Sequence, residues 1–247
     1  MSTPDLFDDG KTVPASGGMR RKDGITDAGL AHFADFYAAQ GGDSSHPAIS
    51  KEDVFYYIYG LLHSEDYKAR YADNLTKELP RIPRVKKAAD FWHFSSAGRK
   101  LADLHVDYET VAMYPVNFVG GALAVQALDD SDFYVTKMKF AKGSGTDEDG
   151  KPIKHDKTRI EYNAKITLTD IPLEAYTYIV NGKPAIEWVM ERQSVTTHKD
   201  SGIVNDANDW AIETMNNARY PLELLRRVIT VSIETMKIVD ALPKLEI

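Results

Sequence analysis

The first third of the chain carries apolar residues at helical spacing. In residues 27–39 one face carries Leu30, Phe33, Ala34 and Tyr37, which predicts a short helix. Ser50 is a good N-cap residue and Asp53 follows it in the position of a capping partner, so the pair predicts the start of a second helix. The run VFYYIYGLLHS that follows is aromatic on more than one side, which is typical of a helix buried in a core.

A connector with two prolines separates this part from the next helix. Its sequence KELPRIPRVKK, residues 77–87, contains five basic residues. Each proline disfavours helix at the residue before it, so residues 79–83 are expected to be extended. A helix in the stretch after Ser64 is expected to end before Pro80, and helical spacing resumes over residues 85–104.

The middle of the chain alternates side chains with the period of a β-strand. In the run DFYVTKMKFA, alternation assigns Tyr134, Thr136, Met138 and Phe140 to one face and Lys137 and Lys139 to the other. Residues 143–156 are polar and rich in turn formers, without a core signal. In RIEYNAKITL, apolar residues flank the turn candidate Asn163-Ala164, which predicts a hairpin.

Two more helices are predicted towards the end of the chain. One covers residues 184–192, and a long one begins at Pro221, which suits a first helical turn, and stops before Pro243. Helices and strands are segregated along the chain instead of alternating. We therefore expect an α+β fold in which a mostly antiparallel sheet packs with helices, with a helical N-terminal part and a long C-terminal helix.

The amino-acid composition restricts the classes of protein to which this chain can belong. The 247 residues are 43% hydrophobic, enough to bury a core, and contain no cysteine, which excludes disulfides and thiolate metal ligands and fits a reducing compartment. Neither a long apolar run nor a signal-peptide pattern is present, so we expect a cytoplasmic protein that binds no membrane. The net charge of -7 argues against nonspecific coating of nucleic acid but allows a local basic face.

No group of residues has the spacing of an active site. Gly10-Lys11-Thr12 resembles the end of a phosphate loop, but that loop needs glycine where this chain has Asp5. The seven histidines are scattered, with no pair spaced four apart on a helix. We therefore expect no catalytic residue, no metal site and no cofactor.

Residues 190–210 form the stretch best suited to contact with DNA bases. Arginine and lysine pair with guanine, whereas asparagine and glutamine pair with adenine. The candidate base readers in this stretch are Arg192, Gln193, Lys199, Asn205 and Asn208. The competing interpretation is an ordinary solvated loop held by Asx turns.

Several long runs resemble a known family. They are DVFYYIYGLLHSEDYKARYADNLTKELPRIP, FWHFSSAGRKLADLH, YIVNGKPAIEWVMERQSVTTHKDSGIVNDANDW and LLRRVITVSIETMKIV. Together they are similar to the C-terminal target recognition region of Type ISP restriction-modification enzymes, over roughly residues 49–243. These enzymes are large single polypeptides that join a nuclease, a helicase-like motor, an adenine methyltransferase and this region. The chain itself lacks the methyltransferase, helicase and complete nuclease motifs.

The resemblance implies a division of the chain and a function. Residues 1–24 would be a flexible lead-in, residues 25–83 a helical connector resembling the methyltransferase junction, and residues 84–247 an α+β target recognition domain. The implied function is sequence-specific recognition of double-stranded DNA by a part that is not itself an enzyme. Its other partners would be the methyltransferase and helicase-like domains of the same polypeptide.

The resemblance also gives the basic connector a role. As a hinge near the DNA backbone it would hold phosphates with Arg81, Arg84, Lys86 and Lys87, which fixes register without reading sequence. By their chemistry, and not by the resemblance, Lys137 and Lys139 of the predicted sheet would reach the major-groove edges of the bases. The alternatives stay open: the connector is a solvated basic linker, or the whole chain is a scaffold module whose aromatic helix and terminal helix dock the other domains.

Overall fold

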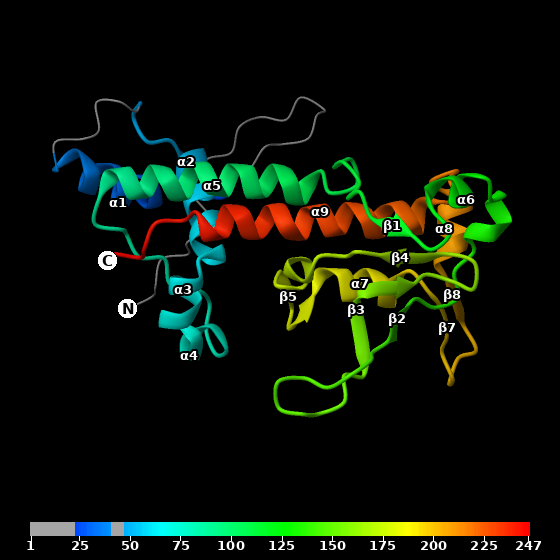
Figure 1. Ribbon diagram of the computed structural model, residues 1–247. Helices are drawn as coiled ribbons and strands as arrows, with labels where there is room; N and C mark the ends of the chain where they lie inside the picture. The colour runs from blue at the N-terminus through cyan, green and yellow to red at the C-terminus, as the bar shows by residue number, and fades with distance from the viewer. Residues whose placement is uncertain (1–22, 41–46) are drawn as a thin grey trace, which may run out of the picture. The chain divides into compact units, whose positions relative to one another are not determined.

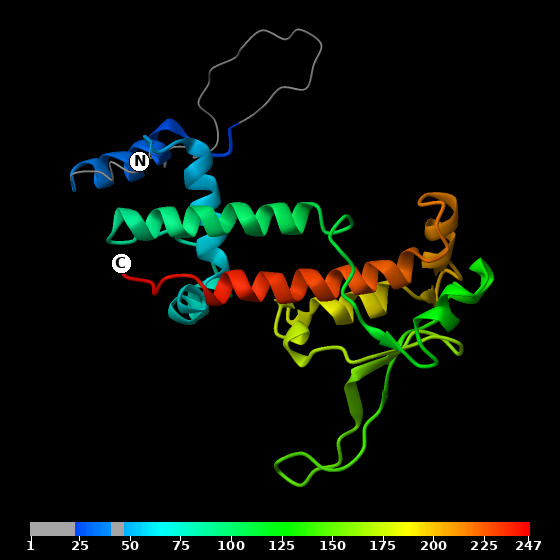
Figure 2. The same ribbon diagram turned by 45° about the horizontal axis from the view of Figure 1, so that its top comes forward.

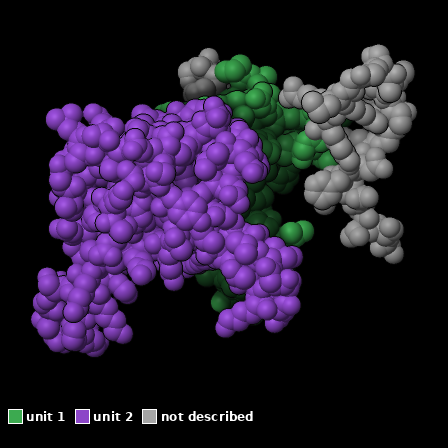
Figure 3. All heavy atoms as spheres, turned by 90° about the vertical axis from the view of Figure 1, so that its right-hand side faces the viewer, with its two compact units in different colours: residues 1–103, 237–247 green, residues 104–236 purple. Residues whose placement is uncertain are grey.

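The computed structural model describes residues 23–40 and 47–247, so most of the predicted lead-in lies outside the described residues. The chain divides into two compact units, coloured separately in Figure 3. Unit 1 runs up to Asp103 and includes Lys237–Ile247, and unit 2 is Leu104–Met236. The predicted boundary at Pro83 does not coincide with this division, because Val85 and Phe91 are buried in the core of unit 1.

Unit 1 is helical, as predicted. Its helices are α1 (Asp27–Ala38), α2 (Lys51–His63), α3 (Glu65–Arg70), α4 (Ala72–Leu75) and α5 (Ala88–Val106), the last of which continues into unit 2. Aromatic rings form the centre of the core: the Tyr57 ring stacks on Phe91 at 4.9 Å between centroids, and Phe33 meets Tyr57 edge-on at 5.3 Å. The single helix expected after Ser64 is instead two short helices joined at Tyr71.

Helices α2 and α5 cross with their backbones in contact (Figure 2). A Cβ atom on Gly98 would lie 1.8 Å from the carbonyl oxygen of Tyr56, and one on Gly60 would lie 2.2 Å from that of Phe94. Both distances are far below van der Waals contact, so any side chain would push the helices apart. Glycine at both positions is therefore a packing requirement of unit 1.

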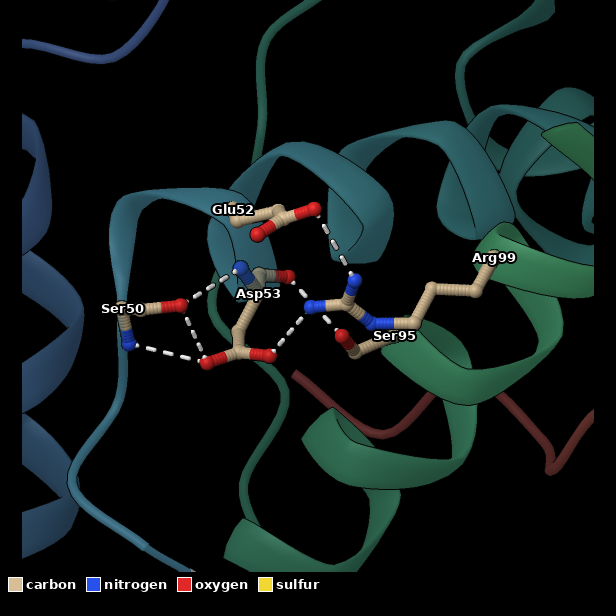
Figure 4. A network of polar contacts seen from close by, with 5 residues as sticks. All are labelled: Ser50, Glu52, Asp53, Ser95 and Arg99. Atoms are coloured by element: carbon tan, nitrogen blue, oxygen red, sulfur yellow. Dashed lines mark hydrogen bonds and ion pairs between the residues drawn. The ribbon is translucent and has the colours of Figure 1, made fainter.

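The start of α2 is tied to α5 by a polar network (Figure 4). Ser50 and Asp53 form the predicted capping box, with the Asp53 carboxylate accepting from the Ser50 backbone at 2.9 Å. Arg99 donates to the same carboxylate at 2.7 Å, and Ser95 donates to the Asp53 carbonyl at 3.0 Å. Burial raises the pKa of Asp53, but the hydrogen bonds from Ser50 and Arg99 outweigh it, so the pKa is lower than its ordinary value.

The proline-containing connector is extended, as predicted, and buried tyrosines hold it. Alternate carbonyls of an extended chain point the same way, and here they point into unit 1. Tyr67, Tyr57 and Tyr37 donate respectively to the carbonyls of Arg81, Pro83 and Val85, at 2.8, 2.6 and 2.8 Å. Burial raises the pKa of Tyr57, which keeps its hydroxyl a donor. The connector is thus an integral part of unit 1.

Unit 2 is built on an antiparallel sheet of four strands in the order β1-β4-β3-β2. They are β1 (Asn117–Phe118), β2 (Lys139–Lys142), β3 (His155–Glu161) and β4 (Thr167–Thr169). Phe140, Ile160 and Leu168 align across the sheet on the core side, whereas Lys139, Glu161 and Thr167 align on the opposite side. The turn at Asn163 confirms the predicted hairpin.

Helices and short elements complete unit 2 (Figure 1). They are α6 (Ala122–Gln126), η1 (Asp130–Phe133), η2 (Leu173–Tyr176), β5 (Ile179–Val180), β6 (Lys183–Pro184), α7 (Ala185–Arg192), β7 (Val195–Thr197), β8 (Val204–Asp206), α8 (Ala207–Glu213) and α9 (Tyr220–Asp240). Ile186 of α7 and Leu225 of α9 join the core beneath the sheet. The predicted α+β fold, the helix over 184–192 and the long terminal helix are confirmed.

The strand predicted over residues 132–141 is wrong in its first half. Residues Asp130–Phe133 form a 3₁₀ helix and regular strand begins only at Lys139. Tyr134 and Thr136 are exposed whereas Met138, predicted on the same face, is buried, so the alternation does not extend back through Tyr134. The reason is tertiary, since the backbone of Val135 bonds to the side chain of Asn208 and not to a neighbouring strand.

Replacing Asp53 with asparagine tests the capping network. Because the folded pKa of Asp53 is lowered, its charge stabilises unit 1 above the unfolded pKa of about 3.9, and this stabilisation is lost as pH falls through the folded pKa. We expect Asp53→Asn to lower the protection of α2 amides by about 1 to 2 kcal/mol at pH 7, measured by native-state hydrogen exchange. The difference should shrink below about pH 4, and a difference that stays constant with pH would contradict the assignment.

Candidate nucleic-acid interface

The segment richest in candidate base readers folds as a hairpin, which the sequence did not predict. Strands β7 and β8 pair antiparallel, with Val195 opposite Asp206, Thr196 opposite Asn205 and Thr197 opposite Val204. Gly202 has a φ of 68°, in the left-handed region that glycine adopts readily, and helps to close the turn. Figure 1 shows the tip of the hairpin pointing away from α8.

The base of the hairpin is fixed by one buried side chain. Asn208 is only 3% exposed, and its amide donates to the carbonyl of Val135 and accepts from the N–H of the same residue, each at 2.9 Å. The Val195 N–H donates to the Thr136 carbonyl at 2.9 Å, which adds a backbone link to the same segment. Asn208 thus holds the fold together, and we remove it from the set of candidate base readers.

One face of the hairpin presents polar side chains to solvent. Side chains alternate along strands, so the opposed pair Thr196 and Asn205 lies on a single face, and both residues are exposed. The Asn205 amide nitrogen lies 3.1 Å from Nε2 of His198, which places His198 beside them. We call Thr196, His198 and Asn205 the hairpin face. It carries a hydroxyl, an imidazole and an amide.

A cavity lined by lysines adjoins the base of the hairpin. It has a volume of about 620 Å³, and Lys137, Lys139 and Lys165 line it. Lys165 is ion-paired with Asp132, and hydrogen bonding to Lys165 lowers the pKa of that carboxyl. Lys139 lies opposite Glu161 in the sheet register. Two acidic residues therefore offset part of the positive charge of this lysine cavity.

The lysine cavity and the hairpin share a wall. Tyr134 and Thr136 line the cavity, and the Tyr134 hydroxyl donates to Asp206 of β8 at 2.7 Å. Thr136 accepts the backbone bond from Val195 of β7. The structure therefore brings Lys137 and Lys139 together with the hairpin, two parts of unit 2 that the sequence analysis linked only through their chemistry.

The remaining candidates in this segment occupy different environments. Lys199 is exposed in the hairpin turn. Gln193 is partly buried, and among the described residues its Oε1 atom has no hydrogen-bond partner. Arg192 is exposed, and its guanidinium carbon lies 5.4 Å from the centre of the Trp188 ring. Arg192 therefore belongs to a separate aromatic surface.

The connector cations belong to unit 1, and most have partners there. Arg81 pairs with Glu78 at 3.2 Å and Lys87 with Glu246 at 3.3 Å. Arg84 donates to the His32 carbonyl at 3.0 Å and lies 4.3 Å from the centre of the Phe36 ring. Lys86 is exposed, while its backbone N–H donates to the Glu246 carbonyl at 2.8 Å. These contacts give the basic connector a structural role within unit 1.

Within the described residues, no cluster of three or more acidic or histidine side chains is arranged to hold a metal ion. Among the described helices, none combines the length and the hydropathy that a bilayer crossing requires.

Comparison with known proteins identifies the family. The family model of the Type ISP C-terminal specificity domain matches residues 2–224, which begins earlier and ends earlier than the resemblance in residues 49–243. No curated protein matches the chain.

Three solved structures are similar to the chain. A nuclease-deletion mutant of the Type ISP restriction-modification enzyme LlaGI, in complex with a DNA substrate mimic, is 39% identical over 82% of this chain and 14% of its own, with a TM-score of 0.65. The ATP-dependent Type ISP enzyme LlaBIII bound to DNA is 38% identical over 81% of this chain and 12% of its own, with a TM-score of 0.67. The DrdV–DNA complex is 32% identical over 94% of this chain and 21% of its own, with a TM-score of 0.68.

This chain thus spans only a small part of the length of these three proteins. The family model covers most of the sequence, and the identity to two Type ISP enzymes extends over more than four fifths of the chain. The chain therefore belongs to the Type ISP C-terminal specificity domain family.

Proposed function

We propose that this chain recognises a short sequence in duplex DNA, as the specificity domain of a single-chain restriction-modification enzyme. Its similarity to three proteins solved with DNA or a DNA mimic, two of them Type ISP restriction-modification enzymes, supports this proposal. The observation that carries it is the hairpin face, where Thr196, His198 and Asn205 lie side by side on a hairpin whose base is fixed by Asn208.

The two-stranded form and the chemistry of the hairpin suit the major groove. That groove admits a two-stranded β-ribbon, and it displays a different set of donors and acceptors for each base pair. The amide of Asn205 can pair bidentately with adenine, while the Thr196 hydroxyl can donate or accept at either kind of pair. Base recognition also requires that the hairpin keep a fixed orientation. The buried Asn208 side chain holds the base of the hairpin and so limits how far the hairpin can move.

The lysine cavity would supply the part of DNA binding that does not depend on the base sequence. Lys137 and Lys139 are exposed beside the hairpin base, where they would contact phosphates flanking the bases being read. Such contacts set register and contribute salt-dependent affinity. A local set of cations also reconciles DNA binding with the net charge of -7.

We assign no catalytic step to this chain. Cleavage, translocation and methyl transfer would be performed by nuclease, motor and methyltransferase parts of a longer polypeptide, because the motifs for these reactions are missing from the sequence. A cytoplasmic location, with access to DNA, fits a chain without cysteine.

The scaffold alternative finds little support in the two helices that suggested it. Val54, Tyr57 and Leu61 of the aromatic helix are at most 1% exposed, because they form the core of unit 1. The apolar residues of α9 such as Leu225 and Ile229 are fully buried in unit 2. These buried residues are not available to dock another domain, which leaves Phe55, 49% exposed, as the aromatic residue of α2 that a partner could contact.

Selection from a randomised duplex pool tests the function directly. We expect the 247-residue chain to enrich one asymmetric motif at low salt, and the same motif to persist when the salt concentration is raised. Persistence is expected because base contacts depend less on salt than phosphate contacts do. Retention of DNA without any enriched motif, or no retention, would contradict the proposal and favour the scaffold.

Two asparagines three residues apart provide a matched comparison. Asn205→Ala should leave the free energy of unfolding unchanged and cost about 1 to 3 kcal/mol of binding to the enriched motif, with little loss on random duplex. Asn208→Ala should instead lower the free energy of unfolding by about 2 to 4 kcal/mol, since it leaves both polar groups of Val135 unpaired. Urea unfolding measures the change in the free energy of unfolding, and fluorescence anisotropy measures the change in DNA affinity. If Asn205→Ala lowers the affinity for the motif and for random DNA equally, Asn205 does not read a base.

Charge removal at the lysine cavity tests the phosphate contacts. The double variant Lys137→Gln and Lys139→Gln should weaken binding to the motif and to random duplex alike. The slope of log affinity against log salt should decrease by about 0.9 for each phosphate that the variant no longer neutralises. Lys151→Gln is the control, because Lys151 lies outside the cavity and pairs with Asp149 at 3.2 Å. An unchanged slope in the double variant would remove the lysines from the interface.

A further inference from the structure

A second cavity in unit 2 has a character quite different from that of the lysine cavity. Its volume is about 500 Å³, within the usual range for small-ligand sites. Four valines line it together with the rings of Tyr108, Tyr178, Trp188 and His105. We call this site the aromatic groove. Neither the hairpin face nor the lysine cavity contributes to it.

The rings of the aromatic groove are held in place by contacts of their own. The indole N–H of Trp188 donates to the Val180 carbonyl at 2.6 Å. The His105 ring stacks on Tyr178 with 5.4 Å between centroids and 15° between planes, and its Nε2 atom lies 2.8 Å from the Thr235 hydroxyl. Side chains fixed in this way lose little freedom when a flat ligand packs against them.

The charge at the rim of the groove is positive. Arg192 lines the groove with its guanidinium 5.4 Å from the Trp188 ring centre, and Asn181 contributes an exposed amide. Among the described residues that line the groove, none is acidic. Lys183 also lies 4.3 Å from the Trp188 ring centre, but it is ion-paired with Glu191. Arg192 is therefore the arginine that lines the groove, and Glu191, whose pKa is lowered by Lys183 and also by Arg192, is its acidic neighbour.

We propose that the aromatic groove binds a single unpaired nucleotide. The base would stack on the fixed rings, the phosphate would pair with Arg192, and the Asn181 amide would bond to the edge of the base. Flat rings beside a guanidinium match this ligand better than they match an aliphatic peptide, which has neither a π-face nor a phosphate. Arg192 ends α7 and Val195 begins β7, so the groove is joined to the proposed reading hairpin by a short link.

The nucleotide has two sources that share this chemistry. One source is an unpaired position in DNA that the hairpin holds, and this possibility rests on the proposed function. The other source is a free mononucleotide, which would bind independently of the proposed function. Both would place the same groups in the groove.

Titration of the intact chain, followed through the indole N–H signals of its three tryptophans, tests the proposal. The Trp188 signal is assigned with Trp188→Phe, while Trp92 and Trp210 lie outside the groove and serve as internal references. The probes are dAMP, a hexamer of single-stranded DNA, and two duplexes that differ by one unpaired base. We expect a saturable shift confined to Trp188. An affinity for the hexamer about tenfold above that for dAMP identifies DNA as the source, and equal affinities identify the free nucleotide.

Two variants keep the proposal falsifiable. Arg192→Ala changes an exposed side chain and should weaken binding about tenfold through loss of the phosphate contact. Val189→Trp should fill the groove and abolish the shift. Leu173→Ala, at an exposed residue outside the groove, should leave it unchanged. No saturable shift with any probe, or a shift that survives both groove variants, would overturn the proposal. Asn205→Ala should not alter this titration, so failure of the groove and failure of the hairpin are distinguishable.

Discussion

The candidate interface depends on one buried amide. Asn208 pairs with both backbone polar groups of Val135, a residue 73 positions earlier in the chain, and so joins the end of the hairpin to the segment that leads into the sheet. Neither group of Val135 can reach water, so a substitution that removes the amide incurs the full cost of unpaired polar groups. Together with the Val195–Thr136 backbone bond and the Tyr134–Asp206 hydrogen bond, this contact sets the position of the hairpin face relative to the cavity lysines.

The charge distribution separates two kinds of basic residue that look alike in the sequence. In the connector, the cations of Arg81, Arg84 and Lys87 have partners within unit 1, and buried tyrosines hold the backbone around them. In unit 2, Lys137 and Lys139 line an open cavity beside the hairpin. The number of basic residues in the connector favoured it as the phosphate-binding site. The contacts of the individual residues instead favour Lys137 and Lys139.

Local signals in the sequence predicted α1, α2, α5, α7 and α9, but not the short helices α6 and α8. Ser50 with Asp53 predicted the start of α2, and Pro221 predicted that of α9, because capping and proline geometry act over a few neighbouring residues. The hairpin was missed because each of its strands is only three residues long and its surroundings are polar. Asn208 was taken for a base reader because its role comes from a contact distant in sequence. Composition drew attention to this segment but could not show which of its side chains face solvent.

The account is tested most directly by amide hydrogen exchange of the whole chain, with and without the duplex that it enriches. Binding through the hairpin face and the lysine cavity predicts new protection at residues 195–206 and 136–139, with the amides of α1 to α4 unchanged. Protection confined to unit 1, or spread evenly over the chain, would contradict the claim that the hairpin anchored by Asn208 reads the DNA.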